Sequence, residues 1–233
     1  MINIKYRVEK KYLVSDGDLL KIKQRLAAIM STDEHQSGQC YEIRSVYFDN
    51  ICDSCFHESE SGVDMRKKFR IRCYNGSDEV IKLEIKEKQM GFNRKISCPI
   101  SREEYELLLA GGELPFGDRV ALNQLLLNMQ IGEMKAKTLV RYERTAFVHP
   151  SGNVRITFDR NISACSEFAD FFSECVSDCV PVLEKGMHVL EVKYDEFLPD
   201  IISKQLEIGN LRQTTFSKYY LGRLAINGEM FQM

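Results

Sequence analysis

Residues 65–74 read MRKKFRIRCY, and from Lys68 onward basic and apolar side chains alternate. Side chains two positions apart in a β-strand lie on the same face of the sheet. The segment therefore predicts a strand with a basic face, formed by Lys68, Arg70 and Arg72, and an apolar face. The apolar face is expected to pack against a core, which leaves the basic side chains on the opposite side of the sheet.

The next predicted strand, residues 79–88 (EVIKLEIKEK), repeats this arrangement, with Lys82, Glu84, Lys86 and Lys88 on its charged face. Similar alternation recurs in segments before and after these two strands. The charged faces of those segments hold, in chain order, Arg7, Glu9 and Lys11; Tyr142 and Arg144; Arg155, Thr157 and Asp159; and Glu191 and Lys193. The sequence thus predicts several strands that each present charge on one side.

Two explanations fit these charged faces. For one strand alone, a face in contact with water is the simpler explanation, and the chain would then be a β-rich domain with a charged surface. However, neighbouring cations repel, and an unpaired buried cation costs about several kcal/mol. A face that repeats cations in several strands therefore indicates a bound polyanion. If the sheet closed into a barrel of about eight strands, these faces would line a basic tunnel, and helices would cover the apolar outside.

The rest of the pattern predicts an α+β fold, with an antiparallel sheet and surrounding helices. The predicted strands span 4–13, 42–49, 65–74, 79–88, 92–100, 136–148, 153–161 and 187–195. The predicted helices span about 17–30, 101–110, 118–130, 199–208 and 218–226. Ser101 and Glu104 form a capping box, Ser15 or Asp16 can cap the first helix, and Ser217 can cap the last. Turns at 75–78 and 89–91 are expected to join three central strands.

Composition limits the class of protein. The 233 residues include 32 Lys and Arg against 34 Asp and Glu, and 44% are hydrophobic, which fits one globular domain over residues 1–233. We find no apolar run of about 18 residues and no secretory signal, so we expect a cytoplasmic protein without a membrane span. Gly-rich nucleotide-binding loops are absent. Phe69 and Phe158 alternate away from the cations, which argues against nucleic acid and favours a phosphate chain without bases.

The 8 cysteines are expected to be free thiols, because disulfides are rare in the reducing cytosol. A minor alternative is a zinc site built from Cys52, Cys55, Cys175 and Cys179, although the spacing fits only half of a zinc motif. Glu9, Glu84 and Glu191 lie among the predicted cations. Their oxygens are candidate ligands for a divalent metal that also bridges phosphates.

Several stretches together resemble one family. They are YRVEKKY (6–12), SVYFDN (45–50), KFRIRCY (68–74), LEIKEK (83–88), YERTAF (142–147), VRITFD (154–159), VLEVKY (189–194) and FSKYYLGR (216–223). The chain resembles the polyphosphate polymerase domain of vacuolar transporter chaperone (VTC) proteins, within the triphosphate tunnel metalloenzyme (CYTH-like) group. The resemblance implies an eight-stranded tunnel that binds triphosphate and polyphosphate.

The resemblance also implies roles for individual residues. The cations expected to grip the reacting phosphates are Lys11, Arg70, Arg72, Lys86, Lys95, Arg144 and Arg155. Further substrate contacts are expected from Glu9, Lys88, Tyr142, Lys193, Ser217 and Lys218. Glu191 is the expected ligand of Mn²⁺ or Mg²⁺. The match is weaker at residues 93–97, where we favour Lys95 over Arg94 and where Ser97 replaces an expected basic residue.

The implied reaction is transfer of the γ-phosphoryl group of ATP to a growing inorganic polyphosphate chain, with release of ADP. One alternative is a triphosphatase of the same tunnel group, acting on inorganic or nucleoside triphosphate. Such hydrolases often carry an E-x-E-x-K pattern in the first strand, where this chain has Arg7 in place of the first Glu. Another alternative is a module that binds polyphosphate without catalysis. Larger family members carry membrane and inositol-phosphate-sensing domains, so a separately encoded membrane protein is a conceivable partner.

Overall fold

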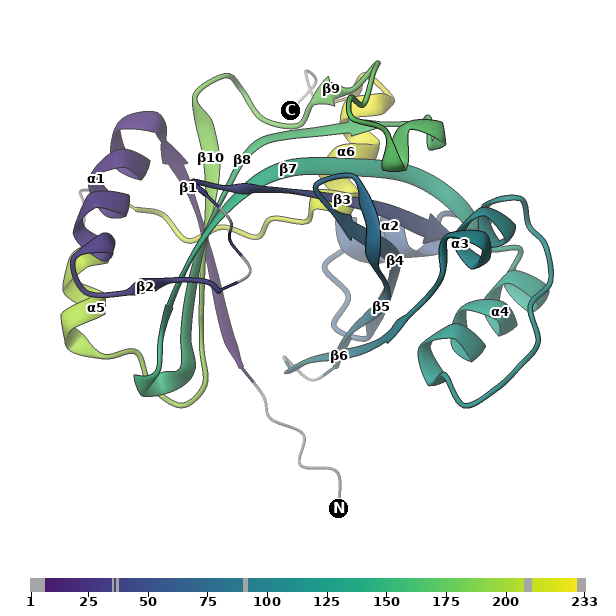
Figure 1. The fold of residues 1–233 in the computed structure, drawn as a ribbon, viewed down its shortest axis with the longest axis horizontal. Helices are drawn as coiled ribbons and strands as arrows, with labels where there is room; N and C mark the ends of the chain where they lie inside the picture. The colour runs from purple at the N-terminus through teal and green to yellow at the C-terminus, as the bar shows by residue number, and fades with distance from the viewer. Residues whose placement is uncertain (1–6, 35, 37, 90–91, 208–210, 230–233) are drawn as a thin grey trace. The chain divides into compact units, whose positions relative to one another are not determined.

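The alternating segments form strands in a computed structural model of the protein, which describes residues 7–34, 36, 38–89, 92–207 and 211–229 (Figure 1). The strands are β1 (Val8–Ser15), β2 (Ser31–Thr32), β3 (Tyr41–Asp49), β4 (Arg66–Tyr74), β5 (Ser77–Gln89), β6 (Phe92–Pro99), β7 (Lys135–His149), β8 (Val154–Cys165), β9 (Val180–Pro181) and β10 (Met187–Tyr194). The α-helices are α1 (Asp16–Ala27), α2 (Ser54–Glu60), α3 (Arg102–Leu109), α4 (Val120–Gly132), α5 (Asp200–Leu206) and α6 (Lys218–Ile226). Within the described ranges, no helix combines the length and the apolar character needed to cross a membrane.

The predicted α+β class is confirmed, and the strands form one large antiparallel sheet. Hydrogen-bonded neighbours follow the order β1-β10-β8-β7-β3-β4-β5-β6, with β2 paired to β7 and β9 paired to β8. The closed barrel is not confirmed, because this order ends at β1 and at β6 among the described residues. The second edge of β1 is occupied locally: the Thr214 N–H donates to the Lys11 carbonyl at 2.8 Å, and Tyr12 bridges to Gln213. Residues 213–214 thus pair with the middle of this edge, at Lys11 and Tyr12.

The chain divides into two compact units, and strands β3, β7 and β8 contribute residues to both. Unit 1 comprises residues 1–42, 142–162 and 183–216, and unit 2 comprises residues 43–141, 163–182 and 217–233. The expectation of one domain over the whole chain stays a prediction. Each unit has its own apolar core, as expected for a fold built from amphipathic strands and helices.

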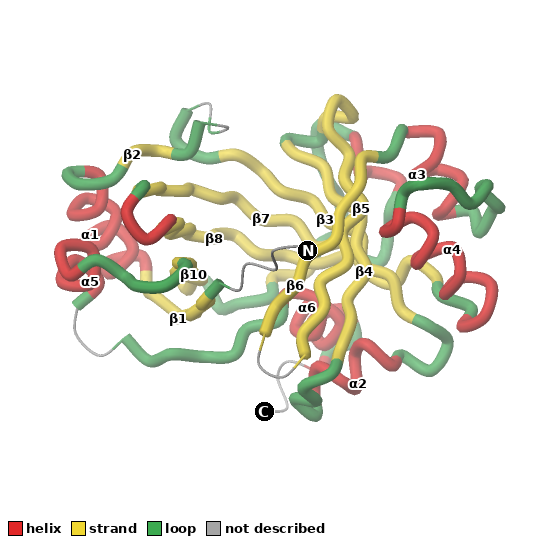
Figure 2. The backbone as a smooth tube through the Cα atoms, turned by 90° about the horizontal axis from the view of Figure 1, so that it is seen from below, coloured by secondary structure: helices red, strands yellow, loops and turns green. Residues whose placement is uncertain are grey.

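In unit 1, helices α1 and α5 lie side by side (Figures 1 and 2). The apolar stripe of α1, with Leu19, Ile22 and Leu26 buried, packs into a core with Phe158 and Leu190 from β8 and β10. Ser15 caps α1, since its side chain accepts a hydrogen bond from the Asp18 N–H at 3.2 Å. This core covers the side of the strands opposite to their charged residues, as the alternation predicts.

In unit 2, α3 and α4 lie beside one another (Figure 2) and pack on the apolar side of the central strands. The cluster joins Phe69 and Ile71 of β4 to Leu83 of β5, and to Leu108 and Leu125 of the two helices. Strands β4, β5 and β6 form the predicted meander. The capping box at the start of α3 is also confirmed, because both of its reciprocal hydrogen bonds are present.

Most predicted elements appear within a few residues of their expected bounds. The predicted strand residues 4–6 and the turn residues 90–91 lie outside the described residues. The short strands β2 and β9 were not predicted, because two residues are too few to show alternation. Residues 50–60, an ambiguous stretch in the sequence, contain α2, and β8 extends four residues past its predicted end at 161.

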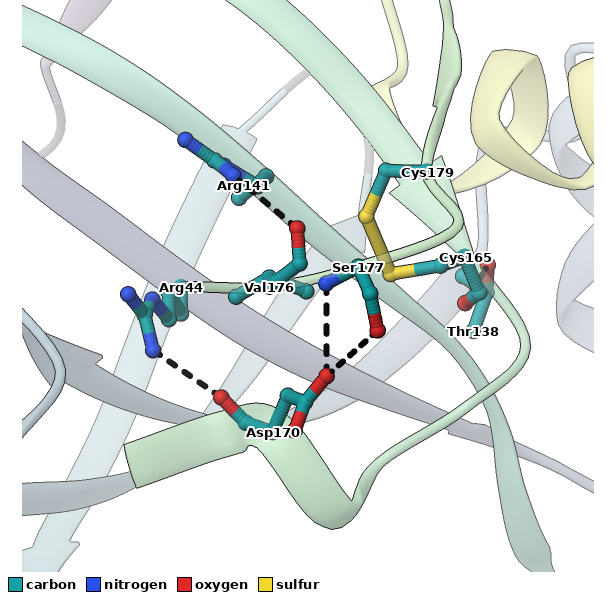
Figure 3. The surroundings of a disulfide bond; sticks show 8 residues. All are labelled: Arg44, Thr138, Arg141, Cys165, Asp170, Val176, Ser177 and Cys179. Carbon is teal, nitrogen blue, oxygen red and sulfur yellow. Dashed lines mark hydrogen bonds between the residues drawn. A yellow bond between two sulfur atoms is a disulfide. The ribbon is translucent and has the colours of Figure 1, made fainter. Parts of the chain in front are cut away.

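One cysteine prediction is wrong, since Cys165 at the end of β8 is joined to Cys179 by a disulfide (Figure 3). The other six cysteines form no disulfide, but the four-thiolate zinc alternative loses Cys179. Composition could not reveal this pair, because only the path of the intervening loop brings the two residues together. That loop is also held by Arg44, which donates to backbone carbonyls from Asp170 to Glu174.

Candidate functional site

Unit 2 carries a basic sheet face, which we call the β4–β6 face. Antiparallel register places the side chains of Cα partners on the same side of the sheet. The partners on this side are Ser45 and Arg72, Tyr47 and Arg70, Arg70 and Glu84, Lys68 and Lys86, Arg66 and Lys88, Arg72 and Lys82, Lys86 and Lys95, and Glu84 and Ser97. The alternation seen in single strands therefore continues across three neighbouring strands.

Like charges lie directly opposite each other on the β4–β6 face. Lys86 is the Cα partner of Lys68 on one side and of Lys95 on the other. Like charges at directly opposite positions destabilise a sheet. This arrangement differs from the other side of the same strands, where Lys67 forms an ion pair with Glu87 at 2.9 Å. The β4–β6 face therefore places three lysines side by side, which the opposite side of these strands does not do.

Glu84 is the buried carboxylate at the centre of this face, with 2% of its surface exposed. Arg70 Nε and Nη2 donate to Glu84 Oε2 at 2.8 and 2.6 Å, and Lys95 Nζ donates to Oε1 at 3.1 Å. Arg72 Nη1 lies 3.7 Å from Oε2. Burial alone would raise the pKa of Glu84, but these three cations hold it far below its ordinary value. Glu84 is therefore an internal counter-ion that remains negative.

The start of α6 adds further polar groups to unit 2. Lys68 Nζ donates to Ser217 Oγ at 2.8 Å, and Ser217 also accepts the Tyr220 N–H at 3.2 Å as the N-cap of the helix. Lys218 is the first residue of α6. Helix N-termini favour anions because their N–H groups lack partners within the helix. Ser217 and Lys218 thus occupy positions suited to the predicted phosphate contact.

Lys88 lies nearer the end of the face, where its Nζ is 3.7 Å from Asp64 Oδ1. Register places Lys95 and Arg94 on opposite sides of β6, and the choice of Lys95 as a phosphate ligand stays a prediction. Lys95 faces Lys86, whereas Arg94 is the Cα partner of Glu87 and lies on the other side of the sheet.

Unit 1 carries a second charged face, which we call the β1–β10–β8 face. Its Cα partners are Glu9 and Lys193, Lys11 and Glu191, Glu191 and Thr157, and Lys193 and Arg155. Two of these pairs, Glu9 with Lys193 and Lys11 with Glu191, join opposite charges, and one, Lys193 with Arg155, joins like charges. The two faces therefore differ in character: the β4–β6 face has an excess of cations, and the β1–β10–β8 face is closer to balance.

Glu191 is the shared acid of the unit 1 face and is 5% exposed. Lys193 Nζ donates to it at 3.0 Å, while Lys11 Nζ and Arg144 Nη2 each lie 3.6 Å from one of its oxygens. Arg144 makes a bidentate pair with buried Asp159, at 2.6 and 2.7 Å. Burial lowers the pKa of Arg144 by itself, but Asp159, Tyr142 and Glu191 together outweigh this effect and raise the pKa well above its ordinary value.

The other predicted residues of unit 1 also lie on this side. Arg155 Nη2 is 2.9 Å from Asp33 Oδ2 and donates to the Tyr41 hydroxyl at 3.2 Å. Tyr142 is buried, with its ring centroid 5.2 Å from the Arg144 guanidinium carbon. The ring therefore supports the guanidinium through a cation–π contact.

The described residues around Glu191 do not supply a full set of protein ligands for a metal ion. Within the described ranges, no three carboxylate, imidazole or thiol groups are arranged to hold a metal ion. Glu9 and Glu191 both contact Lys11, at 3.1 and 3.6 Å. Mg²⁺ is commonly bound by one or two carboxylates together with substrate phosphates. In the structure both carboxylates lie beside Lys11, and the role of Glu191 as a metal ligand stays a prediction.

The predicted site residues thus form two groups, one in each unit, and each group shares a sheet face. No site role was predicted for Asp159, Asp33 or Ser45, although each binds a predicted site arginine. Asp159 was at least placed on the charged side by alternation. The partners of the other two come from distant strands or loops, so no local pattern could have indicated them.

Comparisons with known proteins agree with this fold. A proposed adenylate cyclase from Vibrio parahaemolyticus has a similar structure, with a TM-score of 0.51, 14% sequence identity, and coverage of 93% of this chain and 97% of that chain. A proposed adenylate cyclase from Bacillus halodurans gives a TM-score of 0.49 at 14% identity, with 87% of each chain covered. The PH1012 protein from Pyrococcus horikoshii gives 0.48 at 14% identity, with 95% and 99% covered. No curated protein sequence matches the chain.

The family can be identified from the sequence as a whole. The profile of the VTC domain matches residues 6–227, which include both charged faces and the start of α6. The motifs that suggested this resemblance lie within the matched range. Since the match covers almost all of the 233 residues, the chain belongs to the VTC domain family.

Proposed function

We propose that this protein is a metal-dependent polyphosphate polymerase that transfers the γ-phosphoryl group of ATP to the end of an inorganic polyphosphate chain. The observation that supports this most directly is the stacking of Lys68, Lys86 and Lys95 as Cα partners on the β4–β6 face. These cations repel one another, and a chain of phosphates supplies negative charge at repeated intervals. Membership in the VTC domain family supports the same substrate class.

The reaction requires positioning and charge neutralisation more than a covalent intermediate. A terminal oxygen of the polyphosphate chain attacks the γ-phosphorus of ATP, and the bond from that phosphorus to the β-phosphate bridging oxygen breaks. ADP leaves with that oxygen. The attacking oxygen is already anionic near neutral pH, so the proposal assigns no general base. Each face, taken by itself, offers cations that could bind phosphate.

In this proposal Arg70, Arg72, Lys86 and Lys95 bind phosphates on the β4–β6 face, with Lys88 at its end and with Ser217 and Lys218 at the start of α6. On the separate face of unit 1, the proposed phosphate-binding cations are Lys11, Arg144, Arg155 and Lys193, and the Tyr142 ring lies against Arg144. Glu191, with Glu9, would hold Mn²⁺ or Mg²⁺. When bound, such a cation would neutralise charge on phosphate oxygens.

The test is incubation of the purified protein with ATP and Mn²⁺, followed by gel electrophoresis of the products and quantification of ADP and orthophosphate. We expect polymer and ADP in matching amounts. Orthophosphate without polymer would show hydrolysis and overturn the polymerase assignment. Tripolyphosphate binding with neither product would leave a non-catalytic binding module.

A charge-neutral variant of the metal ligand gives a second check. Glu191→Gln is expected to abolish polymer formation while retaining tripolyphosphate binding, because it removes a carboxylate and no cation. If the variant forms polymer at the wild-type rate, Glu191 does not hold a required metal.

A further inference from the structure

The motif SVYFDN at residues 45–50 has no assigned role in the reaction so far, although it was one of the stretches that indicated the family. In β3, Ser45, Tyr47 and Asp49 alternate and therefore share one side of the strand. Register places Ser45 opposite Arg72 and Tyr47 opposite Arg70, so this side is part of the β4–β6 face. The motif therefore lies against the arginines that are proposed to bind phosphate.

The Tyr47 hydroxyl touches one of these arginines directly. Arg70 Nη1 donates to the Tyr47 hydroxyl oxygen at 3.1 Å. A tyrosine hydroxyl both accepts and donates, so after accepting from Arg70 it still has its own proton to give. The charges that act most strongly on this hydroxyl come from Arg70 and Arg72 of β4 and from Lys218 of α6. All three of these groups are donors only, so none of them can accept the proton of Tyr47.

The Tyr47 ring is held in place from the α6 side. It stacks on the Tyr219 ring, with centroids 5.3 Å apart and planes inclined by 29°. Tyr219 in turn donates to the buried Asp49 carboxylate at 2.6 Å. Tyr47 itself is 5% exposed. The direction of its hydroxyl is therefore set by packing rather than by free rotation of the side chain.

A second buried tyrosine of unit 2, Tyr105, differs from Tyr47 in the charges around its hydroxyl. Burial raises the pKa of both tyrosines by itself. At Tyr47 the nearby cations outweigh burial and lower the pKa, whereas Tyr105 lacks such cations and its pKa is raised. Tyr105 is equally buried, at 3%, and its hydroxyl donates to the Phe168 carbonyl. Tyr47 therefore has a more acidic proton in a cationic environment, which is where an anionic acceptor would bind.

We propose that the Tyr47 hydroxyl donates a hydrogen bond to an oxygen of the bound phosphate chain, which makes Tyr47 a ligand-contacting residue of the β4–β6 face. This inference rests on the proposed function, because it takes a phosphate chain as the ligand. The hydroxyl then connects Arg70 to the ligand by accepting from the guanidinium and donating to the phosphate. A hydrogen bond to a charged group is among the stronger ones in proteins.

The direct test is calorimetric titration of tripolyphosphate into the wild type and Tyr47→Phe, which loses only the hydroxyl. We expect about tenfold weaker binding in Tyr47→Phe, in line with loss of one charge-assisted hydrogen bond. Tyr105→Phe is the matched control and should bind as the wild type does. Lys86→Gln tests the proposed function in parallel. If Lys86→Gln binds normally, the proposed function fails. If only Lys86→Gln binds weakly, the Tyr47 inference alone is overturned.

A pH series separates a direct contact from a role in orienting Arg70. The groups facing the hydroxyl are Arg70 and Arg72 of β4, with Glu84 of β5 bound to Arg70, and Lys218 and Tyr219 of α6. When Tyr47 ionises at alkaline pH, it can no longer donate and it repels phosphate. The ratio of wild-type to Tyr47→Phe affinity should therefore fall as pH rises. If Tyr47 only orients Arg70, its ionisation strengthens that contact and the ratio holds or rises, which would overturn the inference.

The unaltered protein provides a measurement that does not depend on folding of a variant. Bound phosphate should retain the Tyr47 proton, so saturating tripolyphosphate should reduce the tyrosinate absorbance at alkaline pH. An absorbance that does not change, or that increases, on addition of tripolyphosphate would contradict the proposed contact.

Discussion

Glu84 shows how one carboxylate can stabilise a group of cationic side chains without neutralising all of their positive charge. Its carboxylate binds Arg70 and Lys95 and lies close to Arg72, so it reduces repulsion when no ligand is bound. The remaining cations of the β4–β6 face still exceed it in number. The β4–β6 face therefore combines an internal counter-ion with an excess of cationic side chains.

The first prediction is that Glu84→Gln lowers the free energy of unfolding by about 3 kcal/mol at neutral pH, since it removes one partner of a buried ion pair. Urea unfolding measures this change. Tripolyphosphate should recover much of the loss, because it replaces the missing negative charge. A variant as stable as the wild type without ligand would show that Glu84 does not hold the arginines together.

The pH dependence of this effect has a definite sign. The folded-state pKa of Glu84 lies below its unfolded value, which is about 4.3, so its stabilisation is complete above that value and declines as pH falls below it. The difference between wild type and Glu84→Gln should therefore be largest near neutral pH and shrink in acid. An increase of the difference in acid would contradict the assigned charge state.

At the scale of elements, the N-termini of helices α3 and α6 are alike in structure but are assigned different functions. Both begin with a serine that accepts a backbone N–H of the first turn: Ser101 from Glu104 and Ser217 from Tyr220, each at 3.2 Å. Only Ser217 also accepts from a cation of the β4–β6 face, Lys68.

We expect Ser217→Ala and Ser101→Ala to destabilise the protein similarly, by about 1 kcal/mol each, because each removes a helix cap. Only Ser217→Ala should also weaken tripolyphosphate binding. Thermal unfolding and calorimetric titration measure the two effects separately. Equal binding by both variants would remove Ser217 from the site.

The loop after β8 is the second element with a testable feature, the disulfide between Cys165 and Cys179. The sequence separation is 14, and closing a loop of this length stabilises the folded state by up to about 3 kcal/mol. Cys179→Ser should lose part of this stabilisation, while Cys175→Ser, at an exposed free thiol, should not. Mass spectrometry of the wild type after alkylation without reductant should find Cys165 and Cys179 protected. Alkylation of both would contradict the pairing.

For the whole molecule, charge at the β4–β6 face links stability to ligand binding. Lys86→Gln removes repulsion with Lys68 and Lys95, so we expect it to stabilise the ligand-free protein by about 0.5–1 kcal/mol. The same change should weaken tripolyphosphate binding and reduce the stabilisation that the ligand provides, which for the wild type is about 2.7 kcal/mol at a hundredfold excess over Kd.

Lys67→Gln is the matched control for this prediction. Lys67 lies on the same strand as Lys68 but on the opposite side, where it pairs with Glu87. Its loss should slightly lower stability and leave binding unchanged. Thermal melts with and without tripolyphosphate distinguish the two variants. If Lys86→Gln were less stable than the wild type without ligand, the repulsion between these lysines would not be significant.

Much of the fold could be predicted because the determining signals are local. Alternation within β4 and β5 identified their two faces, and the serine caps placed the starts of α1, α3 and α6. The prediction that all cysteines are free thiols is wrong, and the predicted closed barrel is not confirmed. Both depend on residues far apart in the chain, such as Cys165 and Cys179, or on the segment at 213–214 that pairs with the edge of β1.

By itself, the sequence determined which residues form strands, which side of each strand is charged, and to which family the chain belongs, because periodicity and motifs are written in neighbouring residues. Which charges face one another depends on how the strands pair in three dimensions. Register, set by hydrogen bonds between distant strands, stacks Lys68, Lys86 and Lys95 in unit 2 and matches Lys11 with Glu191 in unit 1. Electrostatic energy depends on those distances, so the excess of cations on one face and the near balance on the other emerge only once the strands are paired.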